Sequence, residues 1–207
     1  FGLPTEQDED VRGIVETAAR VQDIGRRYIR GASVTASVST HVPKPHTPFQ
    51  WCAMDDEDET ARKQALLAET ARRLRVELKT HENHQSHIEG IFSRGDRDVA
   101  DVLERAFWLG CRFDGWDEAL RLELWEQAIE ESRAVNPELK VERYLGTIPV
   151  TGRLPWDHLD MALEPDFLLK EYRKALKDRL SPPCGKPFKK LLHPKSVEEA
   201  EAGAKDK

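Results

Sequence analysis

The stretch Ala32-Ser-Val-Thr-Ala-Ser-Val-Ser-Thr40 decides the fold class of this chain, because it alternates small or β-branched residues with hydroxyl residues. Such alternation is typical of a β-strand. Upstream, Phe1-Gly-Leu-Pro4 has the character of a strand end that enters a loop. Between the two, apolar residues recur at helical spacing: Val11, Ile14, Val15, Ala18, Val21 and Tyr28. A strand end, a helix and a strand in this order predict a parallel α/β sheet.

The helices on either side of this strand have recognisable starts. Thr5, with the acidic Asp8 three residues later, predicts the N-cap of the first helix. The acidic run Asp55–Glu59 predicts the start of the next helix, where negative charge suits the helix N-terminus. We interpret this run as a solvated helix start and not as a paired-carboxylate site. Alternation in Arg75–Lys79 then predicts a further short strand.

From Ser86 onward the chain is predicted to be mostly helical. One apolar face is predicted for Val99, Val102, Leu103, Ala106 and Phe107, and another for Leu120, Leu124, Trp125, Ala128 and Ile129. A later helix is predicted from Asp166 to Arg179. We therefore expect three regions: 1–80 with the strands, 81–195 as a helical region, and 196–207 as a charged tail.

Composition excludes several classes of protein. The 207 residues are 39% hydrophobic and 34% charged, with a net charge of −6 and no basic block, so no nucleic-acid-binding surface is evident. No apolar run approaches the roughly 18 residues of a membrane span, and no signal pattern opens the chain. The three cysteines, Cys52, Cys111 and Cys184, are too widely spaced for a zinc site or a disulfide framework. We expect a reducing, cytoplasmic setting and no metal site in this chain.

Two loops have the position at which parallel α/β folds bind ligands, just beyond a strand. They are Gly2–Glu6 and His41–Trp51. Gly2 allows close approach of the backbone to a ligand, and Pro4 fixes the turn that follows. The alternative for the first loop is an ordinary strand-to-helix turn.

The second loop combines hydrogen-bonding groups with two aromatic rings on a backbone stiffened by proline. We predict that it forms a substrate-pocket wall, because pockets pair apolar surface with a few placed polar groups. Its candidate residues are His46, Thr47, Phe49, Gln50 and Trp51. The alternative is an edge crossover that is packed by Phe49 and Trp51.

Three later clusters are further candidates for the substrate pocket. Arg94, Asp96 and Arg97 could bind a carboxylate or phosphate through the guanidinium groups, although such a cluster more often caps a helix. The other two clusters each place an acid or base beside a tryptophan, and the alternative is a buried Trp with Asp as a helix cap. They consist of Asp114 with Trp116, and of Trp156 with Asp157 and His158.

Several motifs together resemble radical S-adenosylmethionine enzymes. Gly2–Asp10 resembles the segment that ends the fifth barrel strand of that family, and Val42–Trp51 resembles the segment after the sixth strand. Later motifs resemble, in the same order, those of the uncharacterised group that carries cobalamin-binding domains. These motifs are Glu89–Arg97, Phe113–Trp116, Leu154–His158 and Ser181–Gly185.

The resemblance implies a fold and a chemistry. The fold would be the C-terminal part of a partial (βα)6 barrel of the TIM-barrel type, over 1–80, followed by the mostly helical region. The full-length enzyme would use S-adenosylmethionine, a 4Fe–4S cluster and, in this group, cobalamin, to act on an unknown substrate by radical chemistry. Gly2, Leu3, Pro4 and Glu6 would bind the cofactor, with the backbone against the adenine, and the wall His46–Trp51 would face the barrel mouth.

The chain departs from the family at the cluster ligands. The C-x-x-x-C-x-x-C motif that belongs near the first barrel strand does not occur here. Because the chemistry depends on the cofactor, we expect a fragment, truncated at both ends, that is inactive alone. A barrel fragment would leave an open parallel edge and an uncovered apolar face, which predicts marginal stability or self-association.

Two other functions stay open at this point. The first is a non-catalytic helical module that holds an anionic or macromolecular partner through the Phe49 and Trp51 wall and the Arg94–Arg97 cluster. The second is an acid–base hydrolase that uses Asp114, Asp157 and His158. It requires these three side chains to converge.

Overall fold

The computed structural model of the chain describes residues 1–81, 83–116, 118–164 and 166–181. It divides into two compact units, the first Phe1–Leu163 and the second beginning at Glu164. The elements of the first unit are α1 (Asp8–Arg26), β1 (Thr35–Val38), α2 (Glu57–Leu74), β2 (Glu77–Thr80), α3 (Asn83–Arg94), α4 (Val99–Leu109), α5 (Leu122–Val135) and the 3-10 helix η1 (Val141–Tyr144).

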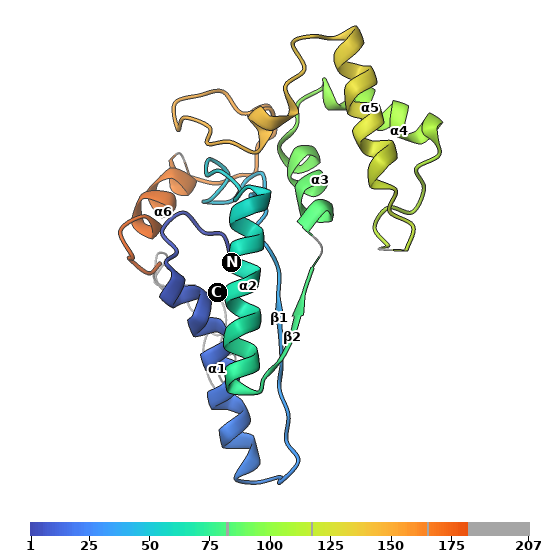
Figure 1. Cartoon of the computed structure of the whole chain (residues 1–207). Coiled ribbons are helices and arrows are strands. Elements are labelled where there is room, and N and C mark those ends of the chain that lie inside the picture. The colour runs from blue at the N-terminus through green and yellow to red at the C-terminus, as the bar shows by residue number, and fades with distance from the viewer. Residues whose placement is uncertain (82, 117, 165, 182–207) are drawn as a thin grey trace, which may run out of the picture. The chain divides into compact units, whose positions relative to one another are not determined.

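The two strands pair in parallel, as the sequence predicts, and α2 connects them (Figure 1). The register places Thr35 opposite Glu77 and Val38 opposite Thr80. β1 is shorter than the predicted stretch 32–40, and β2 begins two residues after the predicted start at Arg75. Arg75 and Val76 instead end α2, where Arg75 adopts a left-handed conformation with φ 54°.

Phe1 is hydrogen-bonded to the segment that follows β1. Its amino group donates to Ser39 O at 3.0 Å, and its carbonyl accepts from His41 N at 2.6 Å. One residue that bonds to the residues before and after Thr40 has the hydrogen-bond pattern of a parallel ladder. Phe1 thus pairs in parallel with the chain just beyond β1, β1 pairs in parallel with β2, and α1 connects Phe1 to β1.

Both connecting helices cover the same face of the sheet. α1 and α2 pack against each other and against β1, and Figure 1 shows them side by side next to the strands. The buried residues of this core are Val11, Val15, Ala36, Val38, Leu67, Ala71 and Val76. Burial of this apolar surface holds the helices on the sheet.

The opposite face of the sheet is polar, so the expectation of an uncovered apolar face is wrong. Thr35 and Ser37 on β1 are exposed beside Glu77 and Lys79 on β2. The Thr35 hydroxyl donates to Glu77 Oε2 at 2.9 Å. Since the apolar side chains of β1 all point to the helices, the open face offers little hydrophobic drive for self-association.

The helices α3, α4 and α5 and η1 build a second core. Its buried residues are Ile91, Val99, Val102, Ala106, Cys111, Trp125, Ala128, Leu139, Val141 and Tyr144. The predicted apolar face of α4 is only partly correct, because Leu103 is 53% and Phe107 47% exposed. Both lie on the flank of the stripe formed by Val102 and Ala106, and the packed neighbours cover a narrower stripe than the sequence pattern suggests.

The start of α1 differs from the prediction. Gln7, not Thr5, is the N-cap residue, and its N–H donates to Asp10 Oδ2 at 2.9 Å. Thr5 belongs instead to a turn that Glu6 N closes on Leu3 O at 3.0 Å, which delays the helix by two residues. The acidic run does begin α2, where the Asp56 side chain accepts from Glu59 N at 2.8 Å.

The second unit contains α6 (Phe167–Ala175), which is shorter at both ends than the predicted helix from Asp166 to Arg179. Cys184, the rest of the motif that begins at Ser181, and the predicted tail 196–207 lie outside the described residues. Within the described ranges, none of the helices combines the length and the apolar character needed to span a membrane.

Candidate functional site

The loop after Phe1 is tightly packed at its first residue. Gly2 has φ +101°, a conformation that L side chains rarely adopt. A Cβ at this position would lie 3.2 Å from Asp55 Oδ2 and 3.5 Å from the Cβ of His41. The chain therefore needs glycine here for both conformation and space.

A buried lysine fixes this loop to α2. Lys63 is 5% exposed, and its Nζ lies 2.7 Å from Asp55 Oδ2 and 3.1 Å from Glu6 Oε1. Glu6 Oε1 also accepts the Gly2 N–H at 2.8 Å. The Glu6 side chain, predicted to face a cofactor, is 7% exposed and is engaged by the protein itself. Its observed contacts hold the loop in place, while Leu3, at 41% exposure, is the accessible apolar side chain.

The surrounding charges change the pKa of Lys63. Burial lowers it, but the hydrogen bonds to Asp55 and Glu6 outweigh burial, and the net pKa is raised. The ammonium form therefore persists at all physiological pH values. It neutralises two carboxylates at the carboxyl end of the strands.

His41 lies at the same strand end. Burial lowers its pKa, so the imidazole is neutral near pH 7. Its ring packs edge-on against Phe49, with centroids 5.7 Å apart. His41 Nδ1, Thr40 Oγ1 and His46 Nε2 are buried and lack a hydrogen-bond partner among the described residues. Buried polar atoms normally have partners, so these three atoms are unsatisfied polar groups within the described residues.

The predicted wall 46–51 folds inward against a distant loop. His46, at φ 56°, donates its N–H to Gln50 Oε1 at 2.9 Å. The same oxygen accepts from Trp156 Nε1 at 2.8 Å, which joins residues 106 positions apart. Trp51 is also buried, and Thr47 Oγ1 donates to Lys44 O at 2.8 Å. Two predicted clusters, the wall and the Trp156 turn, thus form one packed arrangement.

Arg94 is buried completely. Its NH1 donates to Cys52 O at 2.9 Å and its NH2 to Gly146 O at 2.8 Å. No carboxylate pairs with it among the described residues, and burial lowers its pKa. An anion in solvent cannot reach this guanidinium, whose contacts join the segment after Trp51 to the chain after η1.

Asp96 and Arg97, the other two residues of the predicted anion-binding cluster, do not join Arg94 in a common site. Asp96 accepts hydrogen bonds from Asp98 N, Tyr144 and Arg143. Burial, together with the bond to Asp96, raises the pKa of Tyr144 to about 12. Arg97 is exposed. Asp96 does not cap α4, whose N-cap residue is Asp98 without a side-chain cap bond, and instead holds Asp98 N and anchors η1.

Asp114 and the Trp156–His158 turn do not share a contact among the described residues. Asp114 Oδ1 accepts from Trp125 Nε1 at 3.2 Å and lines a cavity of about 390 Å³ with His81, Gln85 and Glu89. Asp157 instead accepts from Leu154 N at 2.8 Å. His158 Nδ1 lies 3.0 Å from Pro155 O, and Trp116 is 69% exposed. The convergence that an acid–base hydrolase requires is not supported.

Sequence reasoning missed the roles of Asp55, Lys63 and His41. Asp55 was interpreted as part of a solvated run, and this is wrong because it forms an ion pair with a buried lysine. In α2, Lys63 lies on the buried stripe with Thr60, Leu67 and Thr70, whereas the apolar pattern of this helix favours Ala61, Ala65 and Ala68, which are exposed. A lysine in such a stripe indicates a buried ion pair, since lysine is almost never fully buried unless paired.

The two described cysteines, Cys52 and Cys111, are buried thiols. Cys52 is 2% exposed, and burial raises its pKa to about 11. Burial also raises the pKa of Cys111. Metals and alkylating agents require the thiolate. Among the described residues, no group of three or more His, Cys, Asp or Glu is placed to hold a metal ion.

Cys52 is therefore expected to resist iodoacetamide at pH 8 in the folded chain and to react once urea unfolds it. Mass spectrometry of the peptide that contains Cys52 measures the modification. Rapid alkylation of Cys52 in the folded chain, at the rate seen in urea, would show that the thiol is accessible and ionised.

Comparisons with known proteins do not assign a family. No family model matches the chain, and no solved structure matches it. Over 107 residues it is 33% identical to an uncharacterised protein of Methanocaldococcus jannaschii, a match that covers 50% of this chain and 21% of that protein. The chain is thus similar to about a fifth of a longer archaeal protein.

Proposed function

We propose that this chain is the C-terminal portion of a radical S-adenosylmethionine enzyme, with the last strands of a partial (βα)6 barrel followed by a helical region. One observation carries the proposal. β1 and β2 pair in parallel, Phe1 pairs with the chain just after β1, and α1 and α2 cover a single face of the sheet. An arc of a βα barrel has this arrangement, and one half of a doubly wound sheet shares it, because the helices of such a sheet change face only where the strand order reverses.

The polar face of the sheet supports the same proposal. In a barrel, the face without helices is the lumen. Here that face carries Thr35, Ser37, Glu77 and Lys79. A barrel lumen that is filled only by packed side chains carries bulky branched residues. A lumen that holds a polar ligand carries polar side chains instead.

The strand-end loop supports a cofactor contact at the expected place. Ligands of βα barrels bind at the carboxyl ends of the strands. Leu3 offers exposed apolar surface to a flat base at that end, while Gly2 is packed against Asp55 and His41. The ion pair of Glu6 and Lys63 holds this loop in a fixed conformation. In the proposed enzyme, bound S-adenosylmethionine and a 4Fe–4S cluster supply a radical that abstracts hydrogen from the substrate.

This chain does not itself fit the iron–sulfur cluster. It holds three cysteines, and the two described ones are buried free thiols with raised pKa values. The cluster ligands would have to come from polypeptide N-terminal to Phe1. Free buried thiols also support the proposed reducing, cytoplasmic setting.

Anaerobic reconstitution with iron and sulfide tests the proposal. A polypeptide extended N-terminally to include a C-x-x-x-C-x-x-C motif is expected to bind iron and absorb near 400 nm, as thiolate-bound clusters do. The chain 1–207 alone is expected to stay colourless and to leave S-adenosylmethionine intact. A coding sequence without such a motif upstream, or a cluster bound by the chain alone, would refute the proposal.

A non-catalytic binding module is the second candidate, and one observation favours it. The helical region has its own core and an open cavity between α3 and α5. The surface first considered for such a module is not available, because Arg94 and Trp51 are buried. A module would therefore bind its partner on the helical region and would need no cluster.

A further inference from the structure

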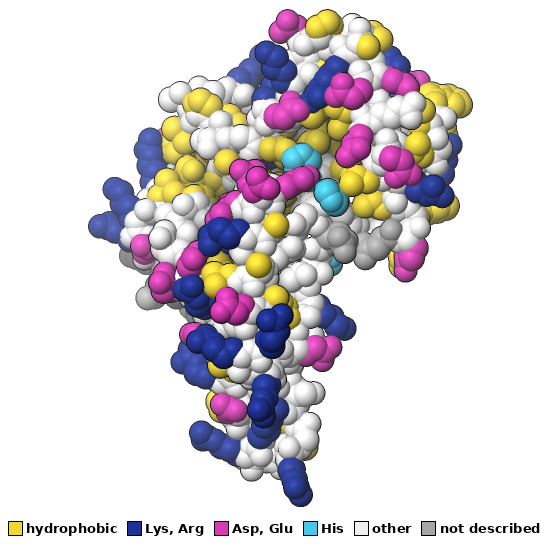
Figure 2. Space-filling view, viewed as in Figure 1, with side chains coloured by type: hydrophobic (Ala, Val, Ile, Leu, Met, Phe, Trp, Pro, Cys, Tyr) yellow, Lys and Arg dark blue, Asp and Glu magenta, His cyan; other side chains and the backbone are white. Residues whose placement is uncertain are grey.

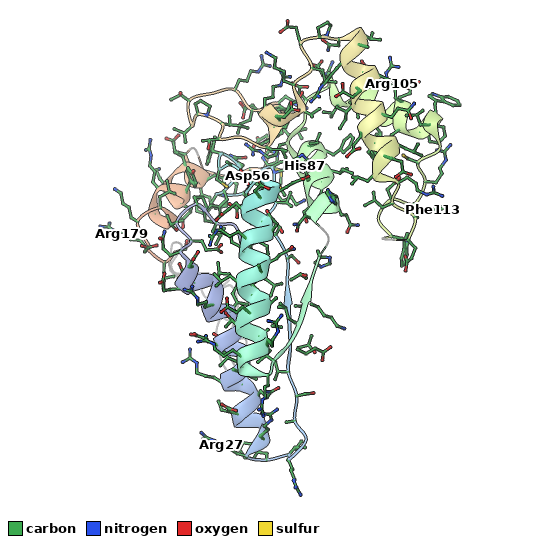
Figure 3. All side chains as sticks on the ribbon, in the orientation of Figure 1. Arg27, Asp56, His87, Arg105, Phe113 and Arg179 are labelled. Carbon is green, nitrogen blue, oxygen red and sulfur yellow. The ribbon has the colours of Figure 1, made fainter. Side chains whose placement is uncertain are left out.

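A groove between α3 and α5 forms a cavity of about 340 Å³ that no residue of the proposed cofactor loop reaches. Figure 3 shows His87 on α3 near Asp56 at the start of α2, and Glu57 and His87 both line the cavity. Its volume lies at the lower end of the range for small-molecule pockets. A small ligand, and not a large cofactor, fits it.

The floor of the groove is apolar. It consists of Ile88, Ile91, Leu122, Trp125, Ile129 and Val141. Ile91, Trp125 and Val141 belong to the buried core, and Ile88 and Ile129 are partly buried against it. Because this core is packed, the floor is a firm surface that can cover a hydrocarbon group.

The rim of the groove is acidic. Four carboxylates line it, from Glu57, Glu126, Glu130 and Glu142, against one guanidinium, that of Arg133. Figure 2 shows histidine side chains flanked by acidic side chains, with hydrophobic atoms between them. The excess of negative charge favours a cationic ligand over an anionic one.

The ion pairs within the rim sharpen this preference. Arg133 already binds Glu130 at 2.7 Å and also contacts Glu142, so the guanidinium is not free for an anion. His84 Nδ1 lies 3.4 Å from Glu57 Oε1. Glu126 has neither a hydrogen bond nor an ion pair with any residue that the structure describes. It is the carboxylate of the rim that can accept a ligand ammonium.

We propose that the groove between α3 and α5 binds a small organic cation, an alkylammonium whose charged end faces Glu126 and whose hydrocarbon chain covers Ile88 and Ile129. The proposal is independent of the radical chemistry. It needs neither S-adenosylmethionine nor the sequence upstream of Phe1. Apart from Glu57 at the start of α2, the residues that line the site lie in the helical region.

Three probes of matched size test it on the full chain: hexylammonium, hexanol and hexanoate. Methyl NMR of isoleucine follows the shifts of Ile88, Ile91 and Ile129, with Ile14 and Ile24 on α1 as internal controls. Hexylammonium is expected to shift the three groove methyls saturably and to bind several-fold more tightly than hexanol, with hexanoate the weakest. Shifts of equal size at Ile14 and Ile24, an equal or higher affinity for hexanoate, or no saturable shift would overturn the proposal.

A pair of charge-neutralising variants locates the ammonium. Glu126→Gln is expected to weaken hexylammonium binding by roughly fivefold, the upper range for one partly exposed ion pair, and to leave hexanol binding unchanged. Glu123→Gln removes the same charge from α5 at an exposed position that does not line the cavity, and is expected to have no effect. Equal losses of hexylammonium affinity in both variants would show that net charge alone causes the preference for a cation, and would overturn the proposed site.

Discussion

Replacement of Arg94 by alanine is expected to lower the free energy of unfolding by about 3 kcal/mol or more. The side chain fills a fully buried position and donates to Cys52 O and Gly146 O. Alanine would leave both carbonyls without these donors and would leave a cavity between them. Urea denaturation followed by circular dichroism measures the change.

Arg97→Ala is the matched control. Arg97 lies three residues further along and is exposed, so its removal is expected to change stability by at most about 0.5 kcal/mol. Arg94→Lys keeps the charge but loses the planar fork that reaches two carbonyls at once, and an intermediate loss is expected. Equal stability of Arg94→Ala and Arg97→Ala would show that the buried guanidinium does not hold the two segments together.

Replacement of Lys63 by methionine is expected to cost roughly 3–5 kcal/mol at pH 7, the range for one partner removed from a buried ion pair. Glu6 and Asp55 would remain as poorly solvated carboxylates without their common ammonium. Arg62→Met is the control, because the Arg62 side chain is 49% exposed and its pairs with Asp8 and Glu59 lie at the surface. Its expected cost is at most about 1 kcal/mol. Similar losses for the two variants would contradict the buried role of Lys63.

The free energy of unfolding is also expected to depend on pH, in the direction that the Lys63 ion pair sets. The pKa of Lys63 is raised in the folded chain. Its contribution to stability is therefore complete below the unfolded value of about 10.4 and is lost as the pH rises through the raised pKa. Comparison of urea midpoints above pH 10 is expected to show an alkaline loss in the natural chain that is smaller in Lys63→Met. An identical alkaline slope would exclude Lys63 as its source.

Local signals in the sequence predicted the sheet well. Alternation in 32–40 and 75–79 identified β1 and β2, and the helix between them implied parallel pairing. The boundaries were less accurate, because the turn at Pro4 and Thr5 competes with the start of α1. The prediction of an apolar open face failed because it came from the general character of parallel strands and not from Ser37 and Lys79 themselves.

The arrangement of the candidate residues was much less predictable. Gln50 is hydrogen-bonded to Trp156, 106 positions away, and Arg94 to Cys52, 42 positions away. Local periodicity in the sequence does not encode such long-range pairs. Arg94 was predicted to bind an anion or to belong to a helix-capping cluster, and its burial without a carboxylate is unusual for arginine. No apolar pattern marks Lys63, since two of the buried positions beside it are Thr60 and Thr70.

Formation of 5′-deoxyadenosine tests the central claim most directly. A polypeptide that contains this chain together with its upstream cluster motif, reconstituted and reduced under anaerobic conditions, is expected to cleave S-adenosylmethionine to 5′-deoxyadenosine and methionine. Substitution of one motif cysteine by alanine is expected to abolish the product. A reconstituted polypeptide that forms no 5′-deoxyadenosine, or forms it equally without that cysteine, would contradict the assignment of this chain to a radical S-adenosylmethionine enzyme.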